Sequence, residues 1–202
     1  MKKIIRLFIA LIVLIATICI VYAIAVTKNQ NMAGGDVYKL VYGIQEYEKI
    51  DTLLKKMSKM GAEEYSSKIT DLLKEGKVWI ALNLHDKQGV YINSLNIIKR
   101  IYIDKNALMN SVAFFEKLRS IDIAIEYLEA FAELTLVGTI LHEYIHYSGI
   151  PDENYVYQRE IDFYQKLKDS EFYNNLNYEQ KEYYNWAIES AIKSAIKARE
   201  YR

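Results

Sequence analysis

The feature that most constrains the fold of this chain is an uncharged segment near its N-terminus. The stretch from Leu7 to Val26 carries no charged residue, and basic residues precede it at Lys2, Lys3 and Arg6. At about 1.5 Å per residue, a helix of this length extends roughly 30 Å, the thickness of the bilayer hydrocarbon core. The stretch therefore predicts a single membrane-spanning helix. The preceding positive charge places the N-terminus in the cytoplasm and the rest of the chain on the extracytoplasmic side.

Two interpretations of this N-terminal segment remain open. Its length and its lack of a helix breaker favour an uncleaved signal-anchor over residues 1–26. The small residues from Ala23 to Ala25 also suit a signal peptidase, and cleavage after Ala25 would give a secreted protein. The polar residues 27–36 then predict a linker, and residues 37–202 are long enough to form one domain with its own core.

Composition argues against a nucleic acid partner for this domain and limits the ligands of any metal site. The chain has 26 basic and 26 acidic residues without a basic stripe, so we do not expect a nucleic acid partner. Its single cysteine, Cys19, lies in the apolar stretch. The exported domain therefore has neither a disulfide nor a thiolate, and any metal site in it must use histidine and carboxylate ligands.

Hydrophobic periodicity predicts an α+β domain that is mostly helical with a small sheet of about three strands, largely antiparallel. Strands are predicted over 77–86 and 89–95, joined as a hairpin, and over 97–104. Helical patterns and their caps are found on both sides of this sheet. The predicted helices cover 37–60, 63–74, a long segment from a cap at Ser120 or Asp122 to Gly149, 152–167, and a segment that begins at Asn177.

Two of the three histidines lie four residues apart on the long predicted helix. His142, Glu143 and His146 form the pattern H-E-x-x-H. Positions i and i+4 differ by about 40° around a helix, so both imidazoles leave the same face. At this spacing two ring nitrogens can bind one Zn²⁺ at about 2.0–2.1 Å. Glu143 points about 60° away from His146, which predicts a general base beside the metal.

This motif, on a helix that follows a predicted sheet, resembles the zincin metallopeptidases. A catalytic zinc has three protein ligands and one open position. The zincins with a third histidine are excluded, because Asp152 occupies that position. The chain is thus similar to the gluzincins, in which a glutamate on the next helix completes the site. The stretch "QREIDFYQ" favours Glu160 as this ligand, while Glu153 and Asp162 remain alternatives.

The resemblance implies a membrane-anchored, zinc-dependent metallopeptidase that hydrolyses peptide or protein substrates. Glu143 would be its general base. The strand over 100–105 would bind an extended substrate by strand addition, unless it is an ordinary core strand. From its spacing alone, Asp162 is favoured as a solvated helix charge, with the orientation of a metal-binding histidine as the alternative. Tyr155 and Tyr157 are candidates to donate to the oxyanion.

Two other functions fit the same residues. The first is a membrane-tethered binding or assembly module with a structural or degenerate metal site, which has no need for Glu143. The second is a hydrolase of a non-peptide amide, which would use the same attacking water.

Overall fold

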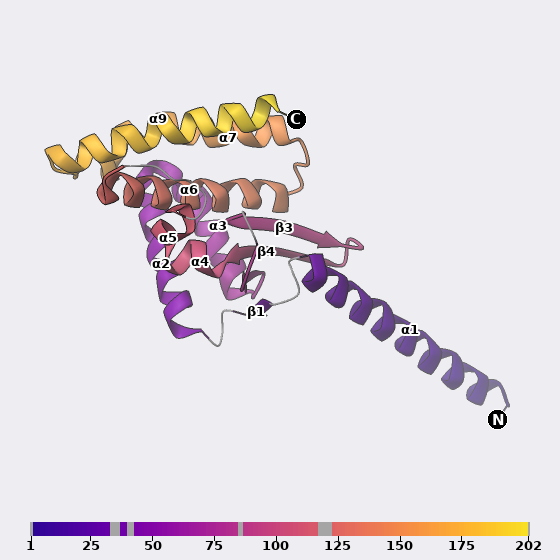
Figure 1. Cartoon of the computed structure of the whole chain (residues 1–202). Coiled ribbons are helices and arrows are strands. Elements are labelled where there is room, and N and C mark those ends of the chain that lie inside the picture. The colour runs from indigo at the N-terminus through magenta and orange to yellow at the C-terminus, as the bar shows by residue number, and fades with distance from the viewer. Residues whose placement is uncertain (1, 33–36, 40–42, 85–86, 117–122, 202) are drawn as a thin grey trace.

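The computed structural model describes residues 2–32, 37–39, 43–84, 87–116 and 123–201, and these form a mostly helical domain from which one long helix projects (Figure 1). The strands are β1 (Val37–Lys39), β2 (Val78–Ala81), β3 (Gly89–Ser94) and β4 (Ile98–Asp104). The helices are α1 (Lys2–Met32), α2 (Ile44–Met57), η2 (Ser58–Ala62), α3 (Glu63–Lys74), α4 (Lys105–Met109), α5 (Ser111–Glu116), α6 (Ile125–Tyr147), α7 (Glu153–Lys166), η3 (Leu167–Asp169), α8 (Glu171–Asn174) and α9 (Tyr178–Glu200).

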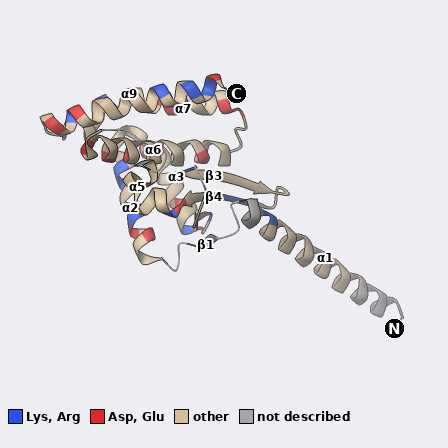
Figure 2. Cartoon of the chain, viewed as in Figure 1, with Lys and Arg blue, Asp and Glu red and all other residues tan. Residues whose placement is uncertain are grey.

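The projecting helix is α1, which is long and apolar enough to cross a membrane by its length and composition. Its middle carries no acidic or basic side chain, whereas α2, α7 and α9 carry charges of both signs (Figure 2). A linker is predicted over residues 27–36, but α1 continues to Met32, so the first part of this segment is helical. Residues 33–36, with the Gly34-Gly35 pair, lie outside the described residues.

The sheet has the order β1-β2-β4-β3, and its pairing differs from the predicted hairpin. β3 pairs with β4 antiparallel, and β2 pairs with the other edge of β4 in the parallel direction. The hairpin therefore joins β3 to β4, and the prediction that β2 and β3 pair is wrong. The tight turn after Ser94 explains this choice, because it brings Ser94 directly opposite Ile98.

The strand proposed to bind substrate is also placed differently. Residues 100–105 belong largely to β4, which has a partner strand on each side and so has no open edge. The alternative of a core strand is thus correct for this segment. The edge strands among the described residues are β1 and β3, and β3 packs beside α6.

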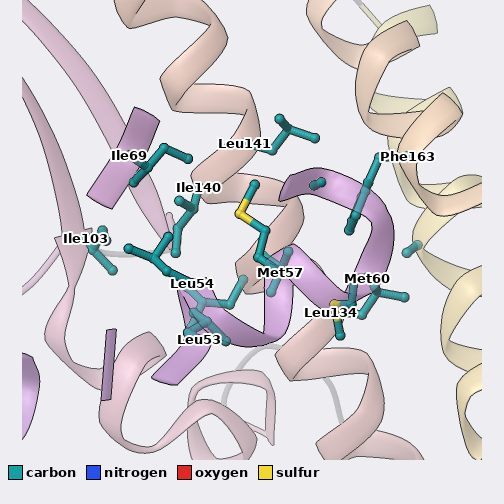
Figure 3. Close-up of a cluster of buried hydrophobic side chains, with 14 of the residues drawn as sticks. Leu53, Leu54, Met57, Met60, Ile69, Ile103, Leu134, Ile140, Leu141 and Phe163 are labelled. Carbon is teal, nitrogen blue, oxygen red and sulfur yellow. The ribbon is translucent and has the colours of Figure 1, made fainter. Parts of the chain in front are cut away.

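Helix α6 forms the centre of the core, between the sheet on one side and α7 and α9 on the other (Figure 1). Its apolar residues are buried around the whole helix, as expected for an internal helix. Figure 3 shows side chains of α6 packed against those of α2, β4 and α7. The labelled α6 residues there are Leu134, Ile140 and Leu141, and each is at most 2% exposed. A rigid, buried helix therefore carries the H-E-x-x-H motif.

Of the helix starts predicted from capping residues, the start of α9 lies within the described residues and can be compared with the structure. Asn177 and Gln180 form a capping box at the start of α9, which confirms the predicted start of that helix. α6 begins at Ile125, and the predicted caps Ser120 and Asp122 lie outside the described residues. The helix predicted over 37–60 is shorter, because the described part of this segment holds β1 before α2 begins at Ile44.

Candidate metal centre

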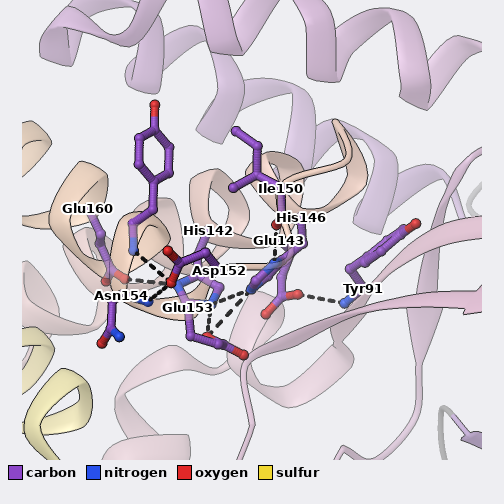
Figure 4. A network of polar contacts seen from close by, with 10 residues as sticks. Tyr91, His142, Glu143, His146, Ile150, Asp152, Glu153, Asn154 and Glu160 are labelled. Atoms are coloured by element: carbon purple, nitrogen blue, oxygen red, sulfur yellow. Dashed lines mark hydrogen bonds and ion pairs between the residues drawn. The ribbon is translucent and has the colours of Figure 1, made fainter. Parts of the chain in front are cut away.

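The two motif histidines occupy one face at the C-terminal end of α6 (Figure 4). Their Nε2 atoms are 3.2 Å apart, and their rings meet edge to face with centroids separated by 4.9 Å. Both side chains are nearly buried, with exposed fractions of 10% for His142 and 13% for His146. The i, i+4 spacing thus brings two imidazole nitrogens to one point, as predicted from the sequence.

The turn after α6 fixes the orientation of His146. Gly149 has φ +103°, a left-handed conformation that favours glycine, and it allows the chain to reverse. The reversal brings the carbonyl oxygen of Ile150 to 2.8 Å from His146 Nδ1. A carbonyl only accepts hydrogen bonds, so Nδ1 must carry the proton and Nε2 must keep its lone pair.

The start of α7 supplies a carboxylate to the same point. Asp152 caps this helix by accepting hydrogen bonds from the backbone amides of Asn154 and Tyr155, at 2.9 and 3.4 Å. Glu153 is the first residue of α7, and its Oε2 lies 3.3 Å from His142 Nε2 and 3.5 Å from His146 Nε2. His142, His146 and Glu153 therefore form a group that could hold a metal ion.

Glu160, the favoured third ligand from the sequence, lies on the other side of His142. Its Oε2 is 3.3 Å from His142 Nδ1, and its Oε1 accepts a hydrogen bond of 2.7 Å from the Tyr164 hydroxyl. The structure thus brings the alternative, Glu153, to the two Nε2 atoms and gives Glu160 the orienting position. Asp162, the alternative considered for that position, accepts a hydrogen bond from Gln158 on the exposed side of α7, in agreement with the favoured interpretation as a solvated helix charge.

A glycine on α6 makes room for this arrangement. A Cβ atom at Gly138 would lie 1.9 Å from the Tyr164 hydroxyl oxygen and 3.0 Å from Glu160 Oε1. A side chain at position 138 would therefore require Tyr164 to shift and Glu160 to move slightly. Tyr164 is fully buried, and burial raises the pKa of its hydroxyl well above the usual value, with the nearby Glu160 charge adding to the effect. The hydroxyl therefore stays protonated and donates to Glu160.

The donor set fits a metal ion because three lone pairs converge. Nδ1–H of His146 donates to Ile150, and Nδ1–H of His142 faces the Glu160 carboxylate, so both Nε2 atoms present lone pairs. Glu153 adds an anionic oxygen at 3.3–3.5 Å from each. A positive charge within this group, from a proton or a metal ion, offsets the repulsion between its lone pairs. Ligands about 2.0–2.1 Å from one tetrahedral zinc ion lie about 3.3 Å from each other, which agrees with the observed spacing.

The charges around His142 also favour a cation. Burial lowers the pKa of its imidazole, but the hydrogen bond with Glu160 and the charges of Glu143, Glu160 and Glu153 outweigh this effect and raise it. Three carboxylates thus surround the two imidazoles. A positive charge at this point, whether a proton or a metal ion, is stabilised by the same carboxylates.

Glu143 points away from the two Nε2 atoms, toward strand β3. Its Oε2 accepts a hydrogen bond of 2.6 Å from the backbone amide of Tyr91. The approach is close because Gly89 has no side chain, and a Cβ there would lie 3.0 Å from Thr139 Cγ2 on α6. Burial raises the pKa of Glu143, while His142 and the Tyr91 amide lower it in part. The raised pKa suits a carboxylate that must take up and return a proton.

A cleft of about 850 Å³ opens over these residues, lined by β3, α6, the start of α7 and the end of α9. Its lining includes His142, Glu143, His146 and Glu153. Of the tyrosines considered as oxyanion donors, Tyr157 lines the cleft, with its ring centroid 4.8 Å from that of His142. Tyr155 is exposed and lies beside Arg159, outside the lining.

The side chains of α7 that face α6 share a spacing that the sequence already contains. Glu153, Tyr157, Glu160 and Tyr164 are separated by four, three and four residues, which places them on one face of a helix. This pattern predicts which residues face the histidines, although it does not distinguish the metal-facing carboxylate from the orienting one. The third histidine, His85, lies outside the described residues.

Comparisons with protein families, with curated proteins and with solved structures find no match to this chain. The resemblance to the gluzincins therefore stays a prediction from the sequence motif.

Proposed function

We propose that this protein is a membrane-anchored zinc metallopeptidase in which His142, His146 and Glu153 hold the metal. The observation that carries the proposal is the convergence of two imidazole lone pairs and one carboxylate oxygen at 3.2–3.5 Å from each other. Soft thiolate ligands are absent from the group, and two imidazoles with one carboxylate are a ligand set of catalytic zinc. The expected ligand set of His142, His146 and Glu160 is thereby revised in one residue.

A zinc ion in this group would act as a Lewis acid that activates water and polarises a carbonyl group. Glu143 follows His142 on α6, lines the same cleft and supplies the base. Its carboxylate takes the proton of the attacking water and returns it to the leaving amine. The Tyr91 amide holds one carboxylate oxygen of Glu143, so the second oxygen is the one available to the proton.

Glu160 and Tyr164 support the group from behind. The Glu160 carboxylate faces Nδ1 of His142, which fixes the tautomer that presents Nε2 to the metal. Tyr164 in turn holds the other oxygen of Glu160 at 2.7 Å. Because each donor in this network already has its acceptor, these side chains need little rearrangement when a metal binds.

The cleft suits an extended peptide. Strand β3 is an edge strand of the sheet and forms one wall, so a substrate strand would add to those of its outer backbone groups that Glu143 does not already bind. α1 would tether this cleft to the membrane, with the domain on the extracytoplasmic side.

The proposal is tested by metal analysis and turnover of the full chain in detergent. Wild type should bind one zinc per chain and cleave a denatured protein mixture, while His146→Ala should lose the metal. Glu143→Gln should keep zinc and lose turnover by about 10²–10⁴-fold, since general-base catalysis contributes this much. The matched control is Glu64→Gln on the surface of α3, which should change neither.

Retained turnover in Glu143→Gln would contradict the mechanism. Zinc in the wild type without cleavage of any peptide would contradict the peptidase and favour the binding or assembly module. Cleavage of an amide that is not a peptide bond would keep the site and change the substrate.

A further inference from the structure

The C-terminal end of α1 is joined to the sheet by a buried asparagine. The side-chain amide of Asn29 donates hydrogen bonds to the carbonyl oxygens of Ile92 and Ile98, at 3.2 and 3.1 Å. Its oxygen accepts a hydrogen bond from the Tyr102 hydroxyl. Asn29 is fully buried, as is Ala25 one turn earlier. All polar atoms of this side chain are satisfied within the protein, so α1 leaves the sheet in a fixed direction.

The two carbonyl acceptors flank the tip of the β3–β4 hairpin, which we define as residues 95–97. Leu95 and Ile97 are exposed by 49% and 46%. Leu95 also has φ +55°, a left-handed conformation that costs an ordinary side chain about 1–2 kcal/mol and that Asn or Gly would adopt more easily. The turn geometry would favour Asn or Gly at position 95 and does not explain a leucine. In water, the exposed apolar side chain of Leu95 adds a hydration cost to this backbone cost.

The hairpin tip lies close to the end of the predicted membrane span. Asn29 follows the last residue of the apolar stretch, Val26, by three positions, which is about 4.5 Å along a helix. The hairpin tip therefore lies near the level at which α1 would leave the bilayer, and Figure 1 shows the β3–β4 turn beside this end of α1. Two exposed basic residues, Lys28 and Lys99, accompany it and match the negative charge of lipid headgroups.

We propose that the hairpin tip is a second membrane contact, in which Leu95 and Ile97 insert into the interface of the bilayer that α1 spans. This inference rests on the proposed membrane anchor and is independent of the metal. It also defines the substrate class. Tyr91, the partner of Glu143, precedes Leu95 by four positions on the extended chain, or about 13 Å. The cleft would thus act on peptide segments that lie at the membrane surface.

The test measures depth in the membrane and not activity. The full chain is placed in lipid vesicles that contain anionic lipid, and a nitroxide spin label is attached in turn to three positions. The first is the native Cys19. The others are Leu95→Cys and Tyr178→Cys, each combined with Cys19→Ser. Tyr178 is 85% exposed at the far end of α9 and serves as the control in water. Accessibility to dissolved oxygen and to a water-soluble paramagnetic reagent gives the depth of each label.

We expect the label at position 95 to be shielded from the water-soluble reagent, as the label at Cys19 is, whereas the label at 178 is not. In the Asn29→Ala background, the shielding at position 95 should be lost while that at Cys19 remains. A label at 95 as accessible to the reagent as the one at 178 would overturn the proposal. So would a label at Cys19 that is open to water, because α1 would then not span the bilayer.

Discussion

Two polar clusters lie on either side of strand β3 and differ in how their hydrogen-bonding groups are satisfied. At one side the amide of Asn29 has a protein partner for every polar atom. At the other side the two Nε2 atoms and a carboxylate oxygen of Glu153 lie within 3.2–3.5 Å of one another, where a proton or a metal ion can lie between them. A cluster of the first kind is complete as folded and can only stabilise the structure. A cluster of the second kind can change its charge, and it could hold a metal ion.

The comparison leads to opposite expectations for substitutions. Changes in the acceptor cluster should alter metal binding more than stability, and relieving its repulsion can even stabilise the metal-free protein. Changes in the Asn29 cluster should alter stability and leave the metal unaffected. Four substitutions of decreasing expected effect test this difference.

The largest effect is expected for Glu153→Ala. Among the described residues, Glu153 supplies the one carboxylate that reaches both Nε2 atoms, so its removal leaves two of the proposed ligands, and we expect zinc to be lost at any concentration that saturates the wild type. Equilibrium dialysis with metal analysis measures this. If Glu153→Ala kept zinc and Glu160→Ala lost it, the ligand assignment would be reversed.

A smaller effect is expected for Glu160→Gln. This residue orients His142 and does not reach its Nε2, so zinc should still bind, with affinity weaker by about 10–100-fold. Competition with a chelator of known affinity gives the ratio. Glu64→Gln is the control for the loss of one charge, and an unchanged affinity in Glu160→Gln would mean that the contact with His142 has no orienting role.

Gly138→Ala tests the space in which Glu160 and Tyr164 meet. The added Cβ would lie 1.9 Å from the Tyr164 hydroxyl oxygen, and we expect the free energy of unfolding to fall by about 1–3 kcal/mol. Thermal unfolding in detergent measures it. The same substitution should cost less in a Tyr164→Phe background, and equal costs in both backgrounds would show that the hydroxyl is not the obstacle.

The smallest effect is expected for Asn29→Ala. Loss of its hydrogen bonds should lower the free energy of unfolding by about 1 kcal/mol, the low end of the cost for a buried group that loses its partner. This corresponds to about 2–4 °C in the unfolding temperature of a chain of this size. Zinc affinity should not change. A change in zinc affinity would mean that the two clusters are coupled through β3.

Local patterns in the sequence predicted the helical part of the fold well. The end of α6 before Gly149, the bounds of α3 and the capping box at Asn177 follow from side chains that act on the adjacent backbone. The strand pairing did not follow, because β2 pairs with β4 through contacts between residues far apart in the chain. Alternation within a strand indicates its faces, but it does not identify its neighbour.

In the candidate site, too, the sequence predicted one part and not the other. The pairing of His142 with His146 depends only on helix geometry, and it was predicted correctly. The choice between Glu153 and Glu160 depends on how closely α7 begins beside α6, and this is set by the path of the turn through Gly149. Periodicity places both carboxylates on one face without giving their height relative to the histidines.

The start of α7 has a consequence for how this chain tolerates insertions. All three proposed ligands come from the continuous segment between His142 and Glu153. One residue inserted into α7 between Glu153 and the buried Val156 would turn Glu153 by about 100° relative to the packed face of this helix and remove its carboxylate from the histidines. The turn itself can absorb an added residue, so the first turn of α7 is the place where a single inserted codon would have the effect of deleting a ligand.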